Sequence, residues 1–215
     1  KKDPSDLIEV HNRPLYLKEL FKNLNSEFIF HFHNDPLAMN GSKLISERIS
    51  MINKCKKIIF CSNWVKNQFI KNIILSEADK KKLSVIEHSI DKKKLVLSKK
   101  KKIITFVGRL NKAKGYDLFG EATLNILKKY KDWEVNVVGD EPREILTYSH
   151  QNFKTLGFLS HKKVLELYER TSIAITCSRW NEPFGRTSME ASSRGCAVIV
   201  TNRGGLKETV TDAII

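Results

Sequence analysis

The stretch Ile-Ile-Thr-Phe-Val-Gly-Arg-Leu-Asn-Lys-Ala-Lys-Gly at residues 103–115 decides the fold class. Its first five residues have the length of a strand and lack the polar alternation of a half-exposed one, which indicates a strand covered on both faces. Gly108 and Arg109 end this strand, and a helix is predicted over residues 115–130. A covered strand followed by a helix is the unit from which parallel α/β sheets are built.

The same unit recurs on both sides of this stretch. Further strands are predicted at residues 7–10, 27–32, 57–61, 83–87, 133–138, 153–156, 173–177 and 197–201. Further helices are predicted at residues 15–24, 43–57, 160–170 and 186–194, with one more that Asn63 would cap. We therefore expect an α/β protein with two Rossmann-like lobes, residues 1–91 and 103–215, each with a parallel sheet. The charged stretch 92–102 would be a lysine-rich linker between them.

The chain has 215 residues and a formal net charge of +14, much of it in the lysine runs 80–82, 92–94 and 99–102. These runs contain no interleaved aromatic residues, so a stacking platform for single strands is not indicated, and we expect no nucleic-acid partner. Two interpretations stay open, a solvated lysine-rich surface and a basic face toward anionic lipid or phosphate-bearing acceptors.

The cellular location is predicted from the length of the apolar stretches and the spacing of the cysteines. No apolar stretch approaches the roughly 20 residues that a membrane span needs. The four cysteines form no C-x-x-C pair, which favours buried thiols over a structural zinc site. We expect a cytoplasmic protein, with peripheral contact at the inner face of the membrane as an extension. The start at Lys-Lys-Asp-Pro, without Met, suggests a fragment.

Two strand exits carry residues suited to an anionic sugar ligand, since parallel sheets bind ligands beyond the carboxyl ends of their strands. At the first exit, Arg109 and Lys114 are a candidate diphosphate clamp, and Gly108 lets the backbone approach the ligand. At the second, Glu182 lies in a turn and Glu190 on the helix that follows, where both could accept hydrogen bonds from vicinal hydroxyls. Taken alone, the two glutamates are better explained as one partner of the helix dipole and one surface residue.

The order of these motifs along the chain resembles that of a known protein family. Gly108-Arg109 and Lys114-Gly115 are followed by Gly139-Asp140, Gly157-Phe158-Leu159, Glu182 and Glu190 seven residues beyond it, and Gly204-Gly205. In this order the chain resembles the donor lobe of the family 4 retaining glycosyltransferases, also called glycosyl transferases group 1, which have the GT-B fold. The resemblance implies a nearly complete nucleotide-sugar-binding lobe at residues 103–215 and a partial acceptor-side lobe at 1–91. It also implies segments missing at both ends, so that the isolated fragment would be inactive.

The resemblance implies a role for each matching residue. Arg109 and Lys114 would neutralise the donor diphosphate, and Glu190 would hold the ribose. Glu182 would act catalytically on the transferred sugar. The sugar and nucleoside would further contact the amides of Phe184, Gly185 and Arg186 and the loop at Leu159. No metal and no cofactor are expected beyond a UDP-, GDP- or ADP-type nucleotide sugar, because basic side chains and helix amides would stabilise the leaving phosphate.

The first lobe resembles the family less closely. His11 and His33 follow apolar runs at two strand ends, where family members carry histidines that face the cleft near the donor sugar. They are therefore the other two catalytic candidates, and His31 is the weaker one because it would sit within a strand. At 87–89 the chain has Glu-His-Ser, where the family commonly shows Pro-Asn-Gly, so any contact made there is in doubt.

Together these features predict a glycosyltransferase that retains anomeric configuration. It would move a sugar from a nucleoside-diphosphate sugar to a hydroxyl of a glycan, lipid-linked or glycolipid acceptor, as in cell-envelope polysaccharide biosynthesis. Two alternatives remain open, another GT-B nucleotide-sugar enzyme such as an epimerase and a non-catalytic sugar-nucleotide-binding module.

Overall fold

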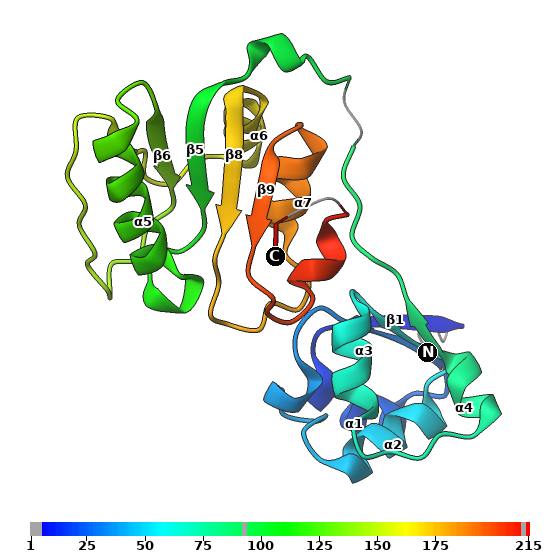
Figure 1. Ribbon diagram of the computed structural model, residues 1–215. Coiled ribbons are helices and arrows are strands. Elements are labelled where there is room, and N and C mark those ends of the chain that lie inside the picture. The colour runs from blue at the N-terminus through cyan, green and yellow to red at the C-terminus, as the bar shows by residue number, and fades with distance from the viewer. Residues whose placement is uncertain (1–5, 92–93, 212–213) are drawn as a thin grey trace. The chain divides into compact units, whose positions relative to one another are not determined.

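The computed structural model describes residues 6–91, 94–211 and 214–215, and it divides the chain into two compact units, residues 1–88 and 89–215 (Figure 1). Each unit contains its own sheet, and all strand pairings within both sheets are parallel. The α/β class and the parallel sheets predicted from the sequence are confirmed.

The first unit has a four-stranded sheet in the order β1-β2-β3-β4. The strands are β1 (Leu7–His11), β2 (Glu27–Phe32), β3 (Lys57–Phe60) and β4 (Leu83–Val85). The helices are α1 (Pro14–Asn23), α2 (Ile45–Lys54), α3 (Asn63–Ile70) and α4 (Glu77–Lys82), with a 3-10 turn at Pro36–Ala38. The core is rich in aromatic rings, because Phe30, Phe32, Phe60 and Phe69 are fully buried and three of these rings pack on one another.

The predicted cap of α3 is wrong by one residue. Ser62 caps the helix, since its Oγ accepts a hydrogen bond from the amide of Val65 at 3.1 Å, and Asn63 is the first helical residue. Serine and asparagine are equally good caps, so composition alone cannot choose between neighbours.

The second unit has a five-stranded sheet in the order β7-β6-β5-β8-β9. The strands are β5 (Lys101–Val107), β6 (Glu134–Val138), β7 (Phe153–Thr155), β8 (Thr171–Thr176) and β9 (Ala197–Val200). The helices are α5 (Tyr116–Lys129), α6 (His161–Arg170) and α7 (Arg186–Ser193), with 3-10 turns at Leu97–Lys99, Lys112–Lys114 and Leu206–Thr209. β5 starts two residues before its predicted beginning, so Lys101 and Lys102 belong to the sheet.

Both faces of the second sheet are covered, as the unbroken apolar strands predict. On one face, Phe106 of β5 packs with Tyr116 and Phe119 of α5. On the other face, Val164 of α6 and Ala191 of α7 pack on the sheet (Figure 1). Because helices cover both faces of the sheet, the carboxyl ends of its strands are where a ligand can reach the sheet.

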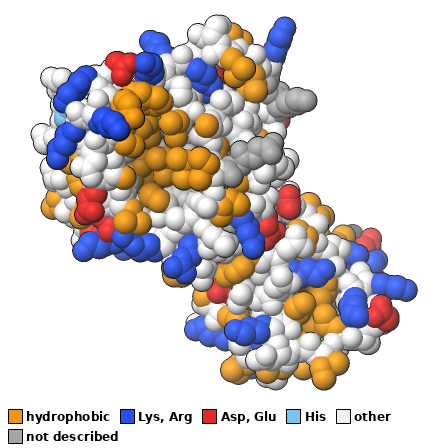
Figure 2. Space-filling model, in the orientation of Figure 1, with side chains coloured by type: hydrophobic (Ala, Val, Ile, Leu, Met, Phe, Trp, Pro, Cys, Tyr) orange, Lys and Arg blue, Asp and Glu red, His pale blue; other side chains and the backbone are white. Residues whose placement is uncertain are grey.

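Figure 2 shows how the basic side chains are distributed over one face of the described residues. Lysine and arginine side chains are scattered over the visible face of each unit, among apolar and neutral surface (Figure 2). Within the described part of the chain, no helix is both long and apolar enough to cross a membrane.

Candidate active site

The candidate site of the second unit lies where its strand order reverses. From β5 the chain proceeds to β6 and β7 on one side, and it then returns to the other side of β5 to form β8 and β9. The loops that leave β5 and β8 therefore run in opposite directions, and open α/β sheets bind ligands in the crevice that this creates. The loop after β5 contains Arg109 and Lys114, and the loop after β8 contains Glu182.

The loop after β5 is held in one shape by local hydrogen bonds. The Asn111 side chain accepts a hydrogen bond from the amide of Lys114 at 3.0 Å, which closes the 3-10 turn at Lys112–Lys114. Gly115 then adopts φ +75° and lies so close to the chain beyond β8 that a Cβ there would be 1.9 Å from the carbonyl oxygen of Cys177. Only glycine fits this position, because it combines a left-handed φ with backbone contact.

The two loops are also bonded to each other. The carbonyl of Ala113 accepts hydrogen bonds from the amides of Arg179 at 2.9 Å and Trp180 at 3.1 Å. Arg179 also pairs with Asp117 at the start of α5, and this guanidinium is the main reason that the pKa of Asp117 is lowered. The Cys177 thiol lies behind the loop, where burial raises its pKa to about 11, so it is an unreactive packing group.

This arrangement brings Lys114 and Glu182 together. Lys114 Nζ lies 2.5 Å from Glu182 Oε1, and the side chains are 27% and 12% exposed. The backbone of Glu182 is fixed as well, because its carbonyl accepts a hydrogen bond from the amide of Gly205 at 2.6 Å. A cation and a carboxylate are thus held at one end of the sheet on separate, rigid loops.

Glu190 forms a second charged group on α7. Its side chain is only 7% exposed, and Oε1 lies 3.1 Å from His161 Nε2 and 3.4 Å from Arg186 Nη2. These three residues line a cavity of about 200 Å³ together with Met189 and the segment Ser89–Asp91. The buried carboxylate thus lines a cavity in which it can accept hydrogen bonds from hydroxyl groups.

The remaining predicted residues of this unit take different positions. Arg109 is exposed, and its guanidinium makes no hydrogen bond or ion pair among the residues described. Gly185 directly precedes α7, whose first amides have no partner within the helix. Phe184 is 4% exposed, so its ring belongs to the core, and Leu159 packs against the core on the α6 and α7 face.

In the first unit, the predicted residues His11 and His33 are in direct contact. His11 Nδ1 lies 3.1 Å from His33 Nε2, and the backbone amide of His33 donates to Asn12 Oδ1 at 3.2 Å. His31 is part of the same stack, with its ring centroid 4.2 Å from that of His11. Burial is the main cause that lowers the pKa of both His31 and His33, and neighbouring imidazoles lower it further.

Sequence reasoning missed one contributor to these groups, His161, and ranked another, His31, below its neighbours. His161 pairs with Glu190 and begins α6, the helix that follows β7. Its position between a strand and the following helix could have identified it, but a single histidine without a surrounding motif was overlooked. His31 lies within β2 as predicted, yet its ring is on the same face as His11, because the two residues are register partners.

A family profile decides the identity. The profile described as "Glycosyl transferases group 1" matches residues 87–214, more than half of the chain. The chain belongs to the group 1 glycosyl transferases. The match covers all of the second unit's sheet and every residue of its candidate site.

Two Bacillus subtilis proteins are similar to this group 1 glycosyl transferase over nearly its whole length. Spore coat protein SA is 27% identical over 99% of the chain, and the putative glycosyltransferase YtcC is 27% identical over 95%. The alignments cover 64% and 57% of these relatives, so the chain spans less than two thirds of either.

Solved structures confirm the GT-B fold. The HepE protein of Anabaena, crystallised in complex with UDP-glucose, is 20% identical with a TM-score of 0.71 over 96% of this chain and 62% of its own. A glycosyltransferase from Rickettsia africae is 24% identical with a TM-score of 0.73, over 96% of this chain and 60% of its own.

Proposed function

We propose that this group 1 glycosyl transferase moves a sugar from a nucleoside diphosphate to a hydroxyl of a glycan, lipid-linked or glycolipid acceptor, with retention of anomeric configuration. The observation that carries the proposal is the Lys114–Glu182 pair at the strand reversal of the second sheet. A nucleotide-sugar donor needs a cation for its phosphates and a carboxylate for its sugar hydroxyls. Here both groups lie at the carboxyl end of the sheet, in the loops after β5 and β8.

The diphosphate would bind to Arg109 and Lys114. Arg109 offers two parallel donors, and its guanidinium is not engaged by any other described residue. Lys114 is paired with Glu182, so an arriving diphosphate would compete with that carboxylate for the ammonium group. As the bond to the sugar breaks, negative charge grows on the phosphate, and these fixed cations stabilise it. We therefore propose that transfer needs no divalent cation and that EDTA leaves donor binding unchanged.

The nucleoside and the sugar would use the carboxylates. Glu190 would accept hydrogen bonds from the ribose hydroxyls in the cavity beside α7, and Glu182 would bind the transferred sugar near the amides of Gly185 and Arg186. In the transfer step the bond from C1 to the phosphate oxygen breaks and a bond from C1 to the acceptor oxygen forms on the same face. The acceptor proton passes to the departing phosphate.

The donor nucleotide can be identified by a thermal-shift screen of the chain with UDP, GDP, ADP and their sugars. A ligand at about 100 times its dissociation constant adds roughly 2.7 kcal/mol of stability, which moves the transition measurably. UDP is the first choice because a structure with the same fold contains UDP-glucose. An epimerised sugar nucleotide formed without acceptor would instead indicate an epimerase.

The location is also a proposal. The net charge of +14 suits peripheral contact with the anionic inner face of the membrane in the cytoplasm. Sedimentation with vesicles that contain phosphatidylserine, against vesicles of phosphatidylcholine alone, tests this contact. Equal recovery with both would leave the lysines as a solvated surface.

A further inference from the structure

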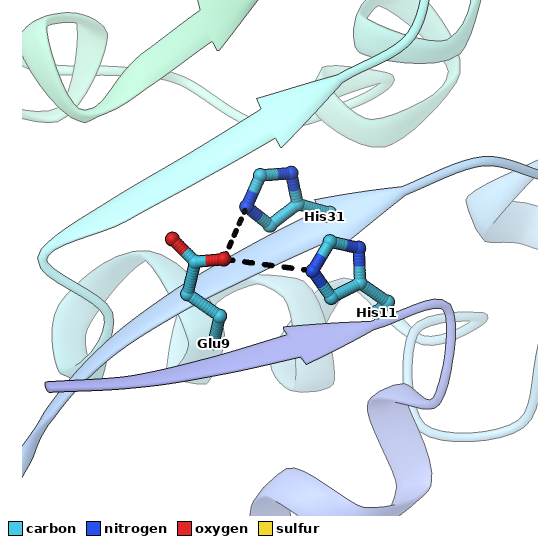
Figure 3. Close-up of side chains that lie close together, drawn as sticks. All are labelled: Glu9, His11 and His31. Atoms are coloured by element: carbon cyan, nitrogen blue, oxygen red, sulfur yellow. Dashed lines mark ion pairs between the residues drawn. The ribbon is translucent and has the colours of Figure 1, made fainter. Parts of the chain in front are cut away.

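Three metal-ligand side chains converge on one face of the first sheet. Glu9 and His11 are two residues apart on β1, so both project from the same face, and His31 of β2 is the register partner of His11. The Glu9 carboxylate lies beside the two stacked imidazoles, with one oxygen facing a nitrogen of each ring (Figure 3). Its Oε2 is 3.6 Å from His11 Nε2 and 3.9 Å from His31 Nε2, and the three ligand atoms all lie within 4.8 Å of one another.

These separations are close to those around a bound zinc ion. Metal–ligand distances of about 2.0–2.1 Å in a tetrahedron place the ligand atoms about 3.3 Å apart. The distances from Glu9 Oε2 exceed this by about 0.3 Å and about 0.6 Å, and the separation of the two histidine nitrogens is at most 4.8 Å. Because the rings of His11 and His31 are stacked, binding would require the His11 ring to rotate out of the stack; His11 and Glu9 are both about half exposed and so have room to move.

His31 supplies a second, independent observation. Its Nε2 is buried and has no hydrogen-bond partner among the described residues, although buried ring nitrogens are normally paired. Glu9 Oε2 lies 3.9 Å from this nitrogen, which is beyond hydrogen-bond distance. A cation between the two atoms would satisfy both, because it accepts the lone pair of the nitrogen and the charge of the carboxylate.

His33 is placed to orient one of the ligands. His11 Nδ1 lies 3.1 Å from His33 Nε2, so a proton on His11 Nδ1 can be donated to His33. That tautomer leaves the lone pair on His11 Nε2, the nitrogen that faces Glu9. A metal-binding histidine commonly donates its other ring N–H to a fixed acceptor in this way.

Without a metal ion, both imidazoles could instead be protonated and pair with Glu9. That arrangement would place two positive charges in stacked rings. The centroids of His11 and His31 are 4.2 Å apart with an interplanar angle of 13°, and like charges at that distance repel. Two neutral rings with a single cation between them and the carboxylate avoid this repulsion.

We propose that Glu9, His11 and His31 form a binding site for a Zn²⁺-type divalent cation, with His33 as the residue that positions His11. Two nitrogens and one carboxylate suit zinc and its neighbours Co²⁺ and Ni²⁺, whereas Mg²⁺ and Ca²⁺ prefer oxygen ligands alone. Three protein ligands leave a coordination position for water or another ligand. This proposal assigns His11 and His33 to a cation site in place of the catalytic role that the family resemblance implies, and it gives the metal no role in donor binding by the second unit.

The test is a titration of the 215-residue chain with Zn²⁺ at pH 7, in competition with a fluorescent chelator. We expect one equivalent to bind, and we expect Glu9→Gln and His31→Ala each to weaken binding at least about tenfold. His33→Ala should weaken it about tenfold through the lost orientation of His11. The controls are Glu27→Gln, an exposed glutamate on β2, and His150→Ala in the second unit, both of which should bind like the wild type.

A second measurement distinguishes the loss of a metal ligand from the unfolding of a variant. Co²⁺ in a tetrahedral nitrogen and oxygen site gives visible absorption bands, which should be present in the wild type and lost in Glu9→Gln with an unchanged far-ultraviolet circular dichroism spectrum. Because Glu9 is 54% exposed, its substitution leaves the core intact. The proposal is overturned if the wild type binds no Zn²⁺, or if Glu9→Gln and His31→Ala bind it as tightly as the wild type.

Discussion

Lys114 Nζ and Glu182 Oε1 lie 2.5 Å apart although the two residues are separated by 68 positions in the sequence. The pair joins the loop after β5 to the loop after β8, the two loops that diverge at the reversal of strand order. Each partner is mostly buried, so the pair is screened less by water than a surface ion pair. The donor site that we propose is built around it.

Glu190 should decide between ribose and deoxyribose. We expect wild-type chain to bind a nucleoside diphosphate more tightly than its 2′-deoxy analogue, because the carboxylate would accept a hydrogen bond from the 2′-hydroxyl. A hydrogen bond to a charged group contributes about 1.5–3 kcal/mol, so the ratio of dissociation constants should be about tenfold or more. In Glu190→Gln this ratio should fall toward one, as measured by calorimetry.

Glu166→Gln on α6 is the matched control for that substitution. It removes one carboxylate from the same unit, and its ratio of dissociation constants should equal that of the wild type. If Glu190→Gln kept the full preference for ribose, Glu190 would have no role at the ribose.

Gly115 should be far less tolerant of alanine than Gly157. Both have a positive φ, of +75° and +65°, so either substitution costs about 1–2 kcal/mol of backbone strain. At Gly157 the new Cβ would meet nothing within 4 Å, whereas at Gly115 it would collide with the Cys177 carbonyl. Gly115→Ala should therefore lower the free energy of unfolding by clearly more than Gly157→Ala in urea denaturation, and it should also weaken nucleotide binding. Equal losses would contradict the loop packing described here.

Lys100 should contribute to the stability of the second unit through its side chain. Its Nζ donates to the carbonyls of Tyr168 at 2.8 Å, Thr171 at 2.7 Å and Arg194 at 2.7 Å, and burial lowers its pKa. Lys100→Met would leave these carbonyls without their donor, so we expect a loss of about 2–4 kcal/mol in urea denaturation.

Lys99→Met serves as the comparison for Lys100→Met. Lys99 is exposed, and surface substitutions usually change stability by less than about 0.5 kcal/mol. Similar losses for both variants would show that the three carbonyl contacts of Lys100 contribute little.

Much of the fold could be predicted from apolar runs. The strand Glu27–Phe32 has the predicted bounds, because an apolar stretch between turn residues leaves little freedom at its ends. Helix α4 (Glu77–Lys82) was not predicted, since it buries none of its residues and so has no apolar face to detect. Its signal was the capping box, in which Ser76 and Asp79 bond each other's backbone amides.

The site could be predicted only in part. Lys114 and Glu182 were each identified from their strand exits, but their contact depends on β5 and β8 being neighbours, which no local pattern determines. The partnership of His161 with Glu190 was missed for the same reason, because it joins the first turn of α6 to α7. Long-range contacts depend on sheet order, and sheet order follows from the packing of the whole unit.

The most direct test of the donor site is a calorimetric titration of the chain with the nucleoside diphosphate that the thermal-shift screen identifies. The variant Arg109→Ala/Lys114→Ala is compared with Lys128→Ala/Lys131→Ala, which removes the same charge from exposed positions of the same unit. Each lost charge-assisted bond should cost about 1.5–3 kcal/mol, so we predict that the first variant binds at least about 100-fold more weakly than the wild type while the second binds normally. Equal affinity of the two variants would contradict the diphosphate site at Arg109 and Lys114.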